Sequence, residues 1–278
     1  MPTVPTVFGA EITLPAIGFG TGGLSGAAGV DAIGRALEVG YRLLDSAVNY
    51  ENEGAVGRAV RQSSVPREEI IVTSKLPGRR HGYDAAIATI EESLYRTGLD
   101  HLDLYLIHWP NTRVDQYVEA WQALITARDR GLVRAIGVSN FLPEHLDRLI
   151  DETGVTPSVN QVELHPFFPQ TEQRAANADR GIITQAWCPI YRGGELLDHL
   201  LLRSIGDRHG VSAAQVVLRW HLQLGVVPIP KSADDERQYE NLDLFGFALT
   251  DEEMVQISAL GREDGRLRGL DPATHEEL

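Results

Sequence analysis

Short apolar runs alternate with stretches of helical periodicity along most of the chain. In 84–97 and 115–130 the apolar residues recur every three or four positions, as on one face of an amphipathic helix. Eight β-rich runs separate such stretches, at 16–20, 41–47, 69–75, 102–109, 134–140, 158–164, 182–187 and 226–230. Repeated alternation of strand and helix predicts an α/β fold.

Glycines and capping pairs mark where the predicted helices end and begin. Glycine at the position after a helix adopts the left-handed conformation without a Cβ penalty. Two other helices begin at capping boxes, Ser212 with Gln215 and Thr250 with Glu253. The glycines that precede predicted strands are Gly40, Gly98, Gly131, Gly181 and Gly225.

Eight strand–helix repeats favour a closed (β/α)8 TIM barrel over an open doubly wound sheet. The segment GFGTGG at 18–23 formally matches the dinucleotide motif of the open sheet, with Asp45 some distance on. Pro15, however, is disfavoured in a central strand, so we interpret these glycines as a strand-to-loop turn. The run 6–15 predicts a short N-terminal β-hairpin, and residues 1–278 are expected to form a single domain.

Three polar side chains come at or near the ends of successive predicted strands. Asp45, Lys75 and His108 each share a face with apolar strand neighbours. One interpretation is structural: an Asp45–Lys75 ion pair and a hydrogen-bonded core histidine. Barrel active sites lie at the carboxyl ends of the strands, and buried charges are costly unless paired. Three such residues together therefore favour an active site.

Tyr50 follows Asp45 in the same predicted loop. A free tyrosine has a pKa of about 10 and is a poor acid at neutral pH. A neighbouring Lys75 ammonium favours the phenolate, so we expect it to lower the pKa of Tyr50. Such a group suits protonation of a carbonyl oxygen as a hydride arrives at its carbon.

The chain resembles the aldo-keto reductases, and in particular the bacterial 2,5-diketo-gluconate reductase-like members. The matching segments, in the family's order, are GFGT, GYRLLDSAVNYENEGAVGRAV, IIVTSKL, LDLYLIHWP, GVSNF, NQVELHP, AWCP and IPKS. The resemblance implies an enzyme, an oxidoreductase that reduces aldehydes or ketones to alcohols by hydride transfer from NADPH. It implies a catalytic tetrad in which Tyr50 is the general acid, Lys75 lowers its pKa, Asp45 anchors Lys75 and His108 orients the substrate.

The resemblance also implies that NADPH or NADP+ lies along the carboxyl ends of the strands. Trp187 matches the aromatic residue that stacks on the nicotinamide ring, although a core tryptophan is the alternative. Lys231, Ser232 and Arg237 match the 2′-phosphate site, a role that suits a dianion, while a solvated charged turn is the alternative. The cofactor-binding residues carried over are Gly20, Thr21, Asp45, Ser139, Asn140, Gln161, Trp187, Cys188, Lys231, Ser232, Arg237 and Asn241.

Three departures from the family pattern affect these expectations. Cys188 stands where relatives often have serine, and a thiol is the weaker hydrogen-bond donor for a pyrophosphate. Ser46 replaces a common threonine, which is a mild change. Asp234 and Asp235 adjoin the implied phosphate site, where they would weaken the preference for NADPH if they faced it.

The substrate pocket is expected to be open, because the loop after His108 is short. Keto-sugars, small aliphatic aldehydes and aromatic carbonyl compounds are all compatible with it. The run 79–81 is interpreted as an exposed basic turn, with recognition of an acidic substrate as the alternative. The residues expected to line the pocket are Tyr50, His108, Trp109, Leu24 and Asn111.

The composition of the chain limits the partners, metal sites and cellular location that it can be expected to have. The 39 acidic and 25 basic residues give a net charge of −14, which disfavours nucleic-acid and membrane binding. A lone Cys188 excludes an internal disulfide, and the histidines show no metal-ligand spacing. With no signal peptide or apolar span visible, we expect a cytoplasmic monomer. Two alternatives stay open: a cofactor-binding regulatory protein and a barrel isomerase or lyase.

Overall fold

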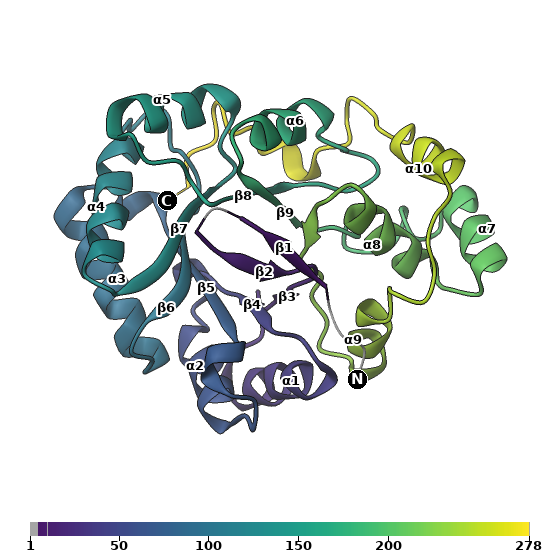
Figure 1. Ribbon diagram of the computed structural model, residues 1–278, viewed down its shortest axis with the longest axis horizontal. Coiled ribbons are helices and arrows are strands. Elements are labelled where there is room, and N and C mark those ends of the chain that lie inside the picture. The colour runs from purple at the N-terminus through teal and green to yellow at the C-terminus, as the bar shows by residue number, and fades with distance from the viewer. Residues whose placement is uncertain (1–4, 10, 278) are drawn as a thin grey trace.

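The computed structural model describes residues 5–9 and 11–277. Its main sheet holds eight parallel strands, each hydrogen-bonded to the next in chain order (Figure 1). All eight predicted strands are confirmed. They are β3 (Phe19–Gly20), β4 (Leu43–Asp45), β5 (Ile71–Leu76), β6 (Leu102–Ile107), β7 (Val133–Ser139), β8 (Val159–Glu163), β9 (Ile183–Trp187) and β10 (Val227–Pro228).

Helices cover the outer side of this curved sheet (Figure 1). The predicted capping boxes begin α8 and α10, and the five predicted helix-ending glycines all have positive φ. The helices are α1 (Gly26–Val39), α2 (Glu53–Gln62), α3 (Tyr83–Thr97), α4 (Tyr117–Asp129), α5 (Pro143–Thr153), α6 (Thr171–Asp179), α7 (Leu200–His209), α8 (Ala213–Gln223), α9 (Asp235–Leu242) and α10 (Asp251–Ser258). Short 3-10 turns occur at η1 (Val48–Tyr50), η2 (Arg67–Glu69), η3 (Gly78–Arg80) and η4 (Leu267–Gly269).

The order of the strands decides between the two α/β architectures. A doubly wound sheet reverses its strand order at a switch point and carries helices on both faces. Here the order runs without reversal from β3 to β10. The open doubly wound alternative is therefore wrong. Within GFGTGG, Gly20 ends β3, and Gly22 and Gly23 form the turn that follows it.

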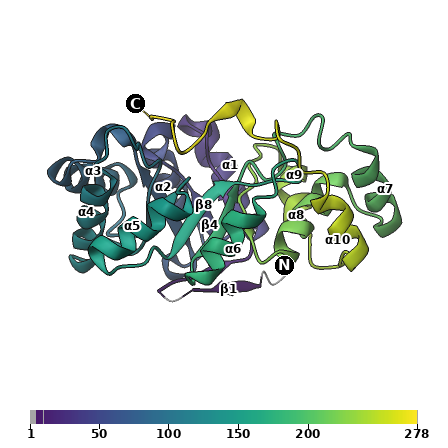
Figure 2. The ribbon, with the colours of Figure 1, turned by 90° about the horizontal axis from the view of Figure 1, so that it is seen from above.

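Strands β1 (Thr6–Phe8) and β2 (Thr13–Pro15) pair in antiparallel fashion, as the sequence predicts. Leu14 of this pair is fully buried against Leu43, Leu104 and other apolar side chains that point inside the curved sheet. Figure 2 shows β1 on the side of the molecule opposite the yellow segment that precedes the C-terminus. The hairpin thus covers one end of the sheet and leaves the other end for a site.

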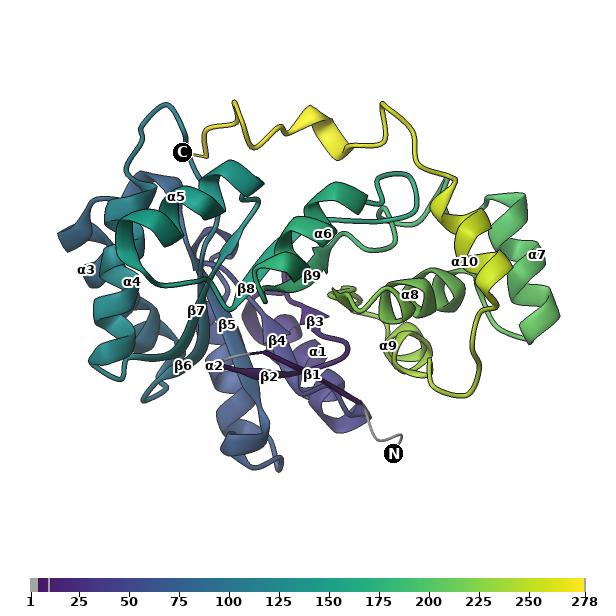
Figure 3. The ribbon, with the colours of Figure 1, turned by 45° about the horizontal axis from the view of Figure 1, so that its top comes forward.

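A segment without regular structure, apart from η4, crosses that other end. We call residues 261–277 the strap; Figure 3 shows it in yellow, running from α10 across the top of the strands. The backbone N–H of Arg262 donates to the carbonyl of Phe167 at 3.1 Å, and a Cβ on Gly265 would lie 1.9 Å from the same oxygen. Glycine is therefore required where the strap passes the loop after β8.

Candidate active site

The strands bring Asp45, Lys75 and His108 together at their carboxyl ends. Asp45 is the last residue of β4, Lys75 lies near the end of β5, and His108 directly follows β6. The ammonium of Lys75 is fully buried, 2.6 Å from the Asp45 Oδ2 and 2.8 Å from the Ser46 carbonyl. Paired in this way, the charge satisfies the requirement for a buried ion.

Tyr50 ends the short turn η1 and places its hydroxyl 3.4 Å from the Lys75 Nζ. The same ammonium lies 4.9 Å from the centre of the tyrosine ring. The ring of His108 meets that of Tyr50 edge-on, with centroids 5.9 Å apart. The four residues proposed from the sequence therefore form one contiguous cluster.

Burial governs the ionisation of this cluster. Burial lowers the pKa of Lys75, but Asp45 and Tyr50 together outweigh it and raise that pKa above its usual value. Burial raises the pKa of Tyr50 above 10, and the lowering effect of Lys75 is smaller. The predicted direction of the lysine effect is right, while the expected net lowering is wrong. The lysine is thus an ammonium and the tyrosine a neutral phenol at neutral pH.

Both carboxylate oxygens of Asp45 have partners. Lys75 contacts Oδ2, and the amide of Gln161 donates to Oδ1 at 2.8 Å. The same amide nitrogen of Gln161 donates to the Gln185 Oε1 at 3.0 Å. Asp45 is therefore fixed from two sides, which suits an anchor for Lys75.

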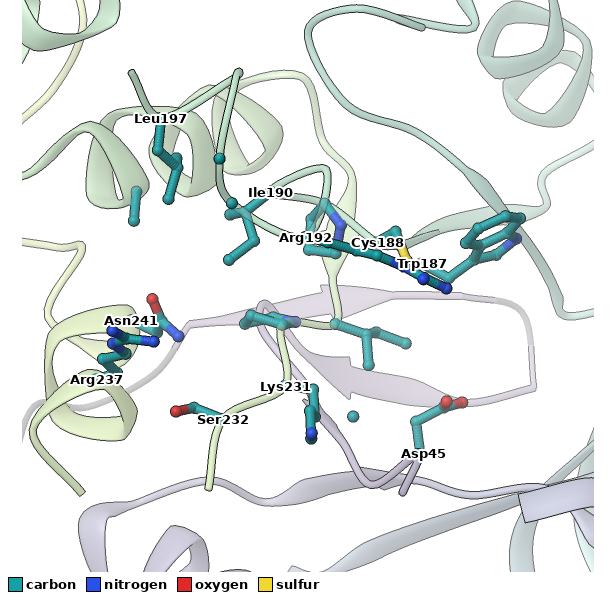
Figure 4. A pocket seen from close by; sticks show the side chains of 18 of the residues that line it. Asp45, Trp187, Cys188, Ile190, Arg192, Leu197, Lys231, Ser232, Arg237 and Asn241 are labelled. Carbon is teal, nitrogen blue, oxygen red and sulfur yellow. The ribbon is translucent and has the colours of Figure 1, made fainter. Parts of the chain in front are cut away.

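A cavity of about 1310 Å³ begins at Tyr50 and His108 and extends to α9. Figure 4 shows Trp187 and Asp45 at one end of it and Arg237 and Asn241 at the other. Of the twelve cofactor residues proposed from the sequence, all but one line this cavity. They are Gly20, Asp45, Ser139, Asn140, Gln161, Trp187, Cys188, Lys231, Ser232, Arg237 and Asn241.

Trp187 is oriented by Asn140 at the wall of the cavity. Its indole nitrogen donates to the Asn140 Oδ1 at 2.8 Å, and the Asn140 Nδ2 donates to the His108 carbonyl at 2.9 Å. Trp187 is only partly buried, unlike the core tryptophans Trp121 and Trp220. Its placement favours the stacking role over that of a core residue.

The far end of the cavity carries positive charge. Lys231 and Arg237 are exposed, and among the described residues neither has a carboxylate partner. Asp234 instead caps α9 by accepting from the Arg237 backbone N–H at 2.9 Å, and Asp235 pairs with Arg35 of α1. Neither aspartate lines the cavity as described, so this departure from the family pattern leaves that end of the cavity positive.

The remaining departure concerns Cys188, which lines the cavity beside Trp187. Burial raises the pKa of the Cys188 thiol, and a hydrogen bond from Arg192 only partly opposes this. The thiol is therefore neutral at neutral pH. It offers only a weak donor to an anion.

The structure places several predicted residues away from the cavity. The Thr21 hydroxyl is buried and donates to the Asp45 carbonyl at 2.8 Å. Leu24 packs in the hydrophobic core, and the Asn111 amide donates to the carbonyl of Glu277 at 2.7 Å. Of the expected pocket residues, Tyr50, His108 and Trp109 line the cavity. Thr21, Leu24 and Asn111 are therefore not among the residues that line the cavity.

The expected basic turn at 79–81 is correct only in part. Arg79 and Arg80 are exposed. His81 is 1% exposed, and burial lowers its pKa to about 4. The turn therefore presents two cations, and the third side chain belongs to the interior.

Sequence reasoning missed several lining residues. Ser212 and the first turn of α8 line the cavity. The capping box at Ser212 marks a helix N-terminus in the sequence, and because helix N-termini attract anions it could have indicated a contact with the cofactor. Gly22, Gly23 and Arg192 also line it. No periodic signal marks Arg192, since it belongs to an irregular loop between β9 and α7.

Two kinds of feature are absent from residues 5–9 and 11–277, the part of the chain that the structure describes. No cluster of histidine, cysteine and carboxylate side chains there is arranged to bind a metal ion. No helix there is both long and apolar enough to cross a membrane.

Known proteins resemble this chain over nearly its full length. The chain is 56% identical to the 2,5-diketo-D-gluconic acid reductase B of Corynebacterium sp. (strain SHS752001), with all of both chains covered. It is 44% identical to the methylglyoxal reductase DkgA of Escherichia coli (strain K12), with 93% of each covered. The crystal structure of a Gox0644 mutant in complex with NADPH superposes with a TM-score of 0.94 at 40% identity, covering 99% of this chain and 100% of that one.

The family model described as "Aldo/keto reductase family" matches residues 16–262. This range contains the tetrad and all of the cavity residues described above. Together with the relatives' identities, this match shows the family that the motifs implied. The chain belongs to the aldo/keto reductase family and is an oxidoreductase that reduces carbonyl compounds with NADPH.

Proposed function

We propose that Tyr50 is the general acid that protonates the carbonyl oxygen of the substrate. The observation that carries this role is the position of its hydroxyl, at the cavity and 3.4 Å from the buried Lys75 ammonium. A phenol that is neutral at rest holds the proton needed for reduction. Lys75 favours the phenolate left behind, so it stabilises the state after transfer.

His108 and Asp45 complete this assignment. His108 lines the cavity beside Tyr50, where its ring can orient the carbonyl oxygen toward the phenol. Asp45 keeps Lys75 charged and in place through the 2.6 Å contact. The reverse reaction, oxidation of an alcohol, uses the same residues with Tyr50 as the base.

The cavity fits an extended dinucleotide. NADPH, when bound, supplies a hydride to the carbonyl carbon. Trp187 and Asn140 are placed to hold the nicotinamide end near Tyr50, and Lys231 and Arg237 to hold the 2′-phosphate at the other end. A Cβ on Gly20 would lie 3.3 Å from the Ile229 carbonyl and the Lys231 Cβ, so glycine keeps the floor of the cavity open.

Replacing Arg237 tests the phosphate end. We expect Arg237→Ala to weaken NADPH binding by about ten- to a hundredfold, because a hydrogen bond to a charged group contributes about 1.5–3 kcal/mol. NADH, which lacks the 2′-phosphate, should bind nearly as before. Dissociation constants from quenching of tryptophan fluorescence would show the difference.

Arg35→Ala is the matched control for that experiment. Arg35 also lies near α9, but its guanidinium faces Asp235 and is outside the cavity. We expect both cofactors to bind this variant normally. Equal weakening of NADPH and NADH in Arg237→Ala would contradict the proposed phosphate site.

We propose compact, polar carbonyl compounds as substrates, above all those whose carbonyl adjoins a second oxidised carbon. The names of the two relatives support this class, since methylglyoxal and diketogluconate both have that feature. The Arg192 side chain at the cavity wall offers a charge to an acidic member. NADPH oxidation should be fastest with vicinal dicarbonyls and keto-sugar acids in a panel that includes aliphatic and aromatic aldehydes. No turnover with any member, despite bound NADPH, would contradict a reductase and favour a regulatory role.

We also propose that the sheet closes into a (β/α)8 barrel and that residues 1–278 form one domain. Two hydrogen bonds at β3 and β10, the outermost strands in the order of the main sheet, support closure. The Gly18 N–H, just before β3, donates to the Pro228 carbonyl at 3.0 Å, and the Gly20 N–H donates to the Pro230 carbonyl, just after β10, at 2.9 Å. The lone cysteine supports a reducing compartment, the cytoplasm.

A further inference from the structure

The strap carries a carboxylate to the ring of His108. The Glu277 Oε1 lies 2.7 Å from the His108 Nδ1. The same oxygen accepts from the Asn49 Nδ2 at 2.7 Å, and Oε2 accepts from the Gly78 backbone N–H at 3.0 Å. The Glu277 side chain is only 12% exposed, so this carboxylate is enclosed by its three partners.

The strap is fixed in register where it delivers this side chain. The Asn111 Nδ2 donates to the Glu277 carbonyl at 2.7 Å, and the Glu277 N–H donates back to the Asn111 Oδ1 at 3.0 Å. The Arg113 N–H donates to the Glu276 Oε1 at 2.8 Å. The loop after β6, which begins with His108, is thus hydrogen-bonded both to the backbone of the strap and to its carboxylates.

The charges around Glu277 favour its ionised form. Burial raises the pKa of Glu277, but His108, the Gly78 N–H and Asn49 outweigh it, so the net pKa lies below the usual value. His81, packed nearby, is neutral at neutral pH because burial lowers its pKa to about 4, although Glu277 opposes this. Arg79 reaches the same region through Asn49. Glu277 is therefore ionised at neutral pH, and its carboxylate contacts the ring of His108.

We infer that Glu277 is a positioning residue for carbonyl reduction: it holds the His108 ring in the form with both nitrogens protonated, so that Nδ1–H faces the strap and Nε2–H can donate to the substrate oxygen. The inference rests on the proposed role of His108. The His108 Nδ1 is buried and makes no hydrogen bond to any described residue, and the Glu277 Oε1 lies 2.7 Å from it as its ion-pair partner. The carboxylate thus fixes the rotation of the ring by charge as well as by contact.

Removing the carboxylate should misalign the ring without touching the cofactor. We expect Glu277→Ala to lower kcat by about ten- to a hundredfold, since a small misplacement of a catalytic group has effects of this size. NADPH affinity should be unchanged, because Glu277 does not line the cavity as described. Added formate should restore part of the lost kcat by occupying the vacated carboxylate site.

Two further variants separate positioning from a structural role. Glu276→Ala removes the neighbouring carboxylate, which reaches the Arg113 N–H and not His108, and should keep full kcat with no response to formate. Glu277→Gln keeps the shape but places an amide NH2 among donors, so it should lose kcat as the alanine variant does. Formate should not rescue it, because the amide fills the space.

The same proteins distinguish failure of this inference from failure of the proposed function. Wild type that does not oxidise NADPH with any carbonyl compound contradicts the function, whatever the variants do. The inference is then tested by NMR: a His108 ring N–H protected from exchange should be present in wild type and Glu276→Ala and lost in Glu277→Ala. Normal kcat in Glu277→Ala, equal loss in Glu276→Ala, loss without formate rescue, or an unchanged ring N–H would each overturn the inference.

Discussion

Tyr50→Phe is expected to abolish carbonyl reduction while leaving NADPH bound. General acid catalysis contributes about a hundred- to ten-thousandfold to rate, and the variant removes only the hydroxyl that faces Lys75. We therefore expect kcat to fall by about a thousandfold, with little change in thermal stability. Steady-state turnover and NADPH fluorescence titration on the same sample measure the two quantities.

The pH dependence of wild type follows from the same hydroxyl. Reduction needs the protonated phenol, and burial raises the pKa of Tyr50 above 10 although Lys75 opposes it. The rate of reduction should therefore be insensitive to Tyr50 ionisation near neutral pH and decline only in the alkaline range.

Tyr105→Phe is the control for the Tyr50→Phe variant, since the Tyr105 hydroxyl contacts Ser93 in the core; it should keep full kcat. A Tyr50→Phe enzyme with more than a tenth of the wild-type kcat would contradict the assignment.

Lys75→Met is expected to have the second-largest effect, on both rate and stability. It removes the ammonium that stabilises the Tyr50 phenolate, so kcat should fall by about a hundredfold or more. It also leaves the buried Asp45 carboxylate without its 2.6 Å partner. Breaking one side of a buried ion pair costs about 3–5 kcal/mol of unfolding free energy. Turnover and urea denaturation report the two effects separately.

The double variant Asp45→Asn with Lys75→Met separates these effects. Without either charge the buried site has no unpaired ion, and the new amide retains an oxygen for the Gln161 amide that now donates to Asp45. Most of the lost unfolding free energy should return, while kcat should stay low. If kcat recovered along with stability, Lys75 would be a structural residue and not part of the acid machinery.

The repeating pattern predicted most of the fold because each repeat has local signals. The capping boxes of α8 and α10 and the glycines that end helices were read from a few neighbouring residues. Strand alternation likewise placed Asp45 and Lys75 on the inner face of the sheet. The tetrad could therefore be predicted as a cluster before any distance was known.

Contacts over long separations could not be predicted in this way. The residues of the strap follow no periodic pattern, so the sequence gives no sign that Glu277 contacts His108. The direction of the Tyr50 pKa depends on the degree of burial, which a strand pattern does not give. The position of Asn111 in the loop after His108 predicts a pocket residue, whereas its side chain is hydrogen-bonded to the Glu277 carbonyl of the strap.

Every role assigned above depends on hydride transfer from NADPH to a carbonyl carbon within this cavity. The transfer can be followed by mass spectrometry after reduction of a vicinal dicarbonyl with NADPH deuterated at C4 of the nicotinamide. We predict that, with deuterium on the transferred face, one deuterium appears on the new alcohol carbon with wild type and that Tyr50→Phe forms this product about a thousandfold more slowly. An unlabelled alcohol from cofactor deuterated on either face, or labelled product at the wild-type rate from Tyr50→Phe, would contradict this mechanism.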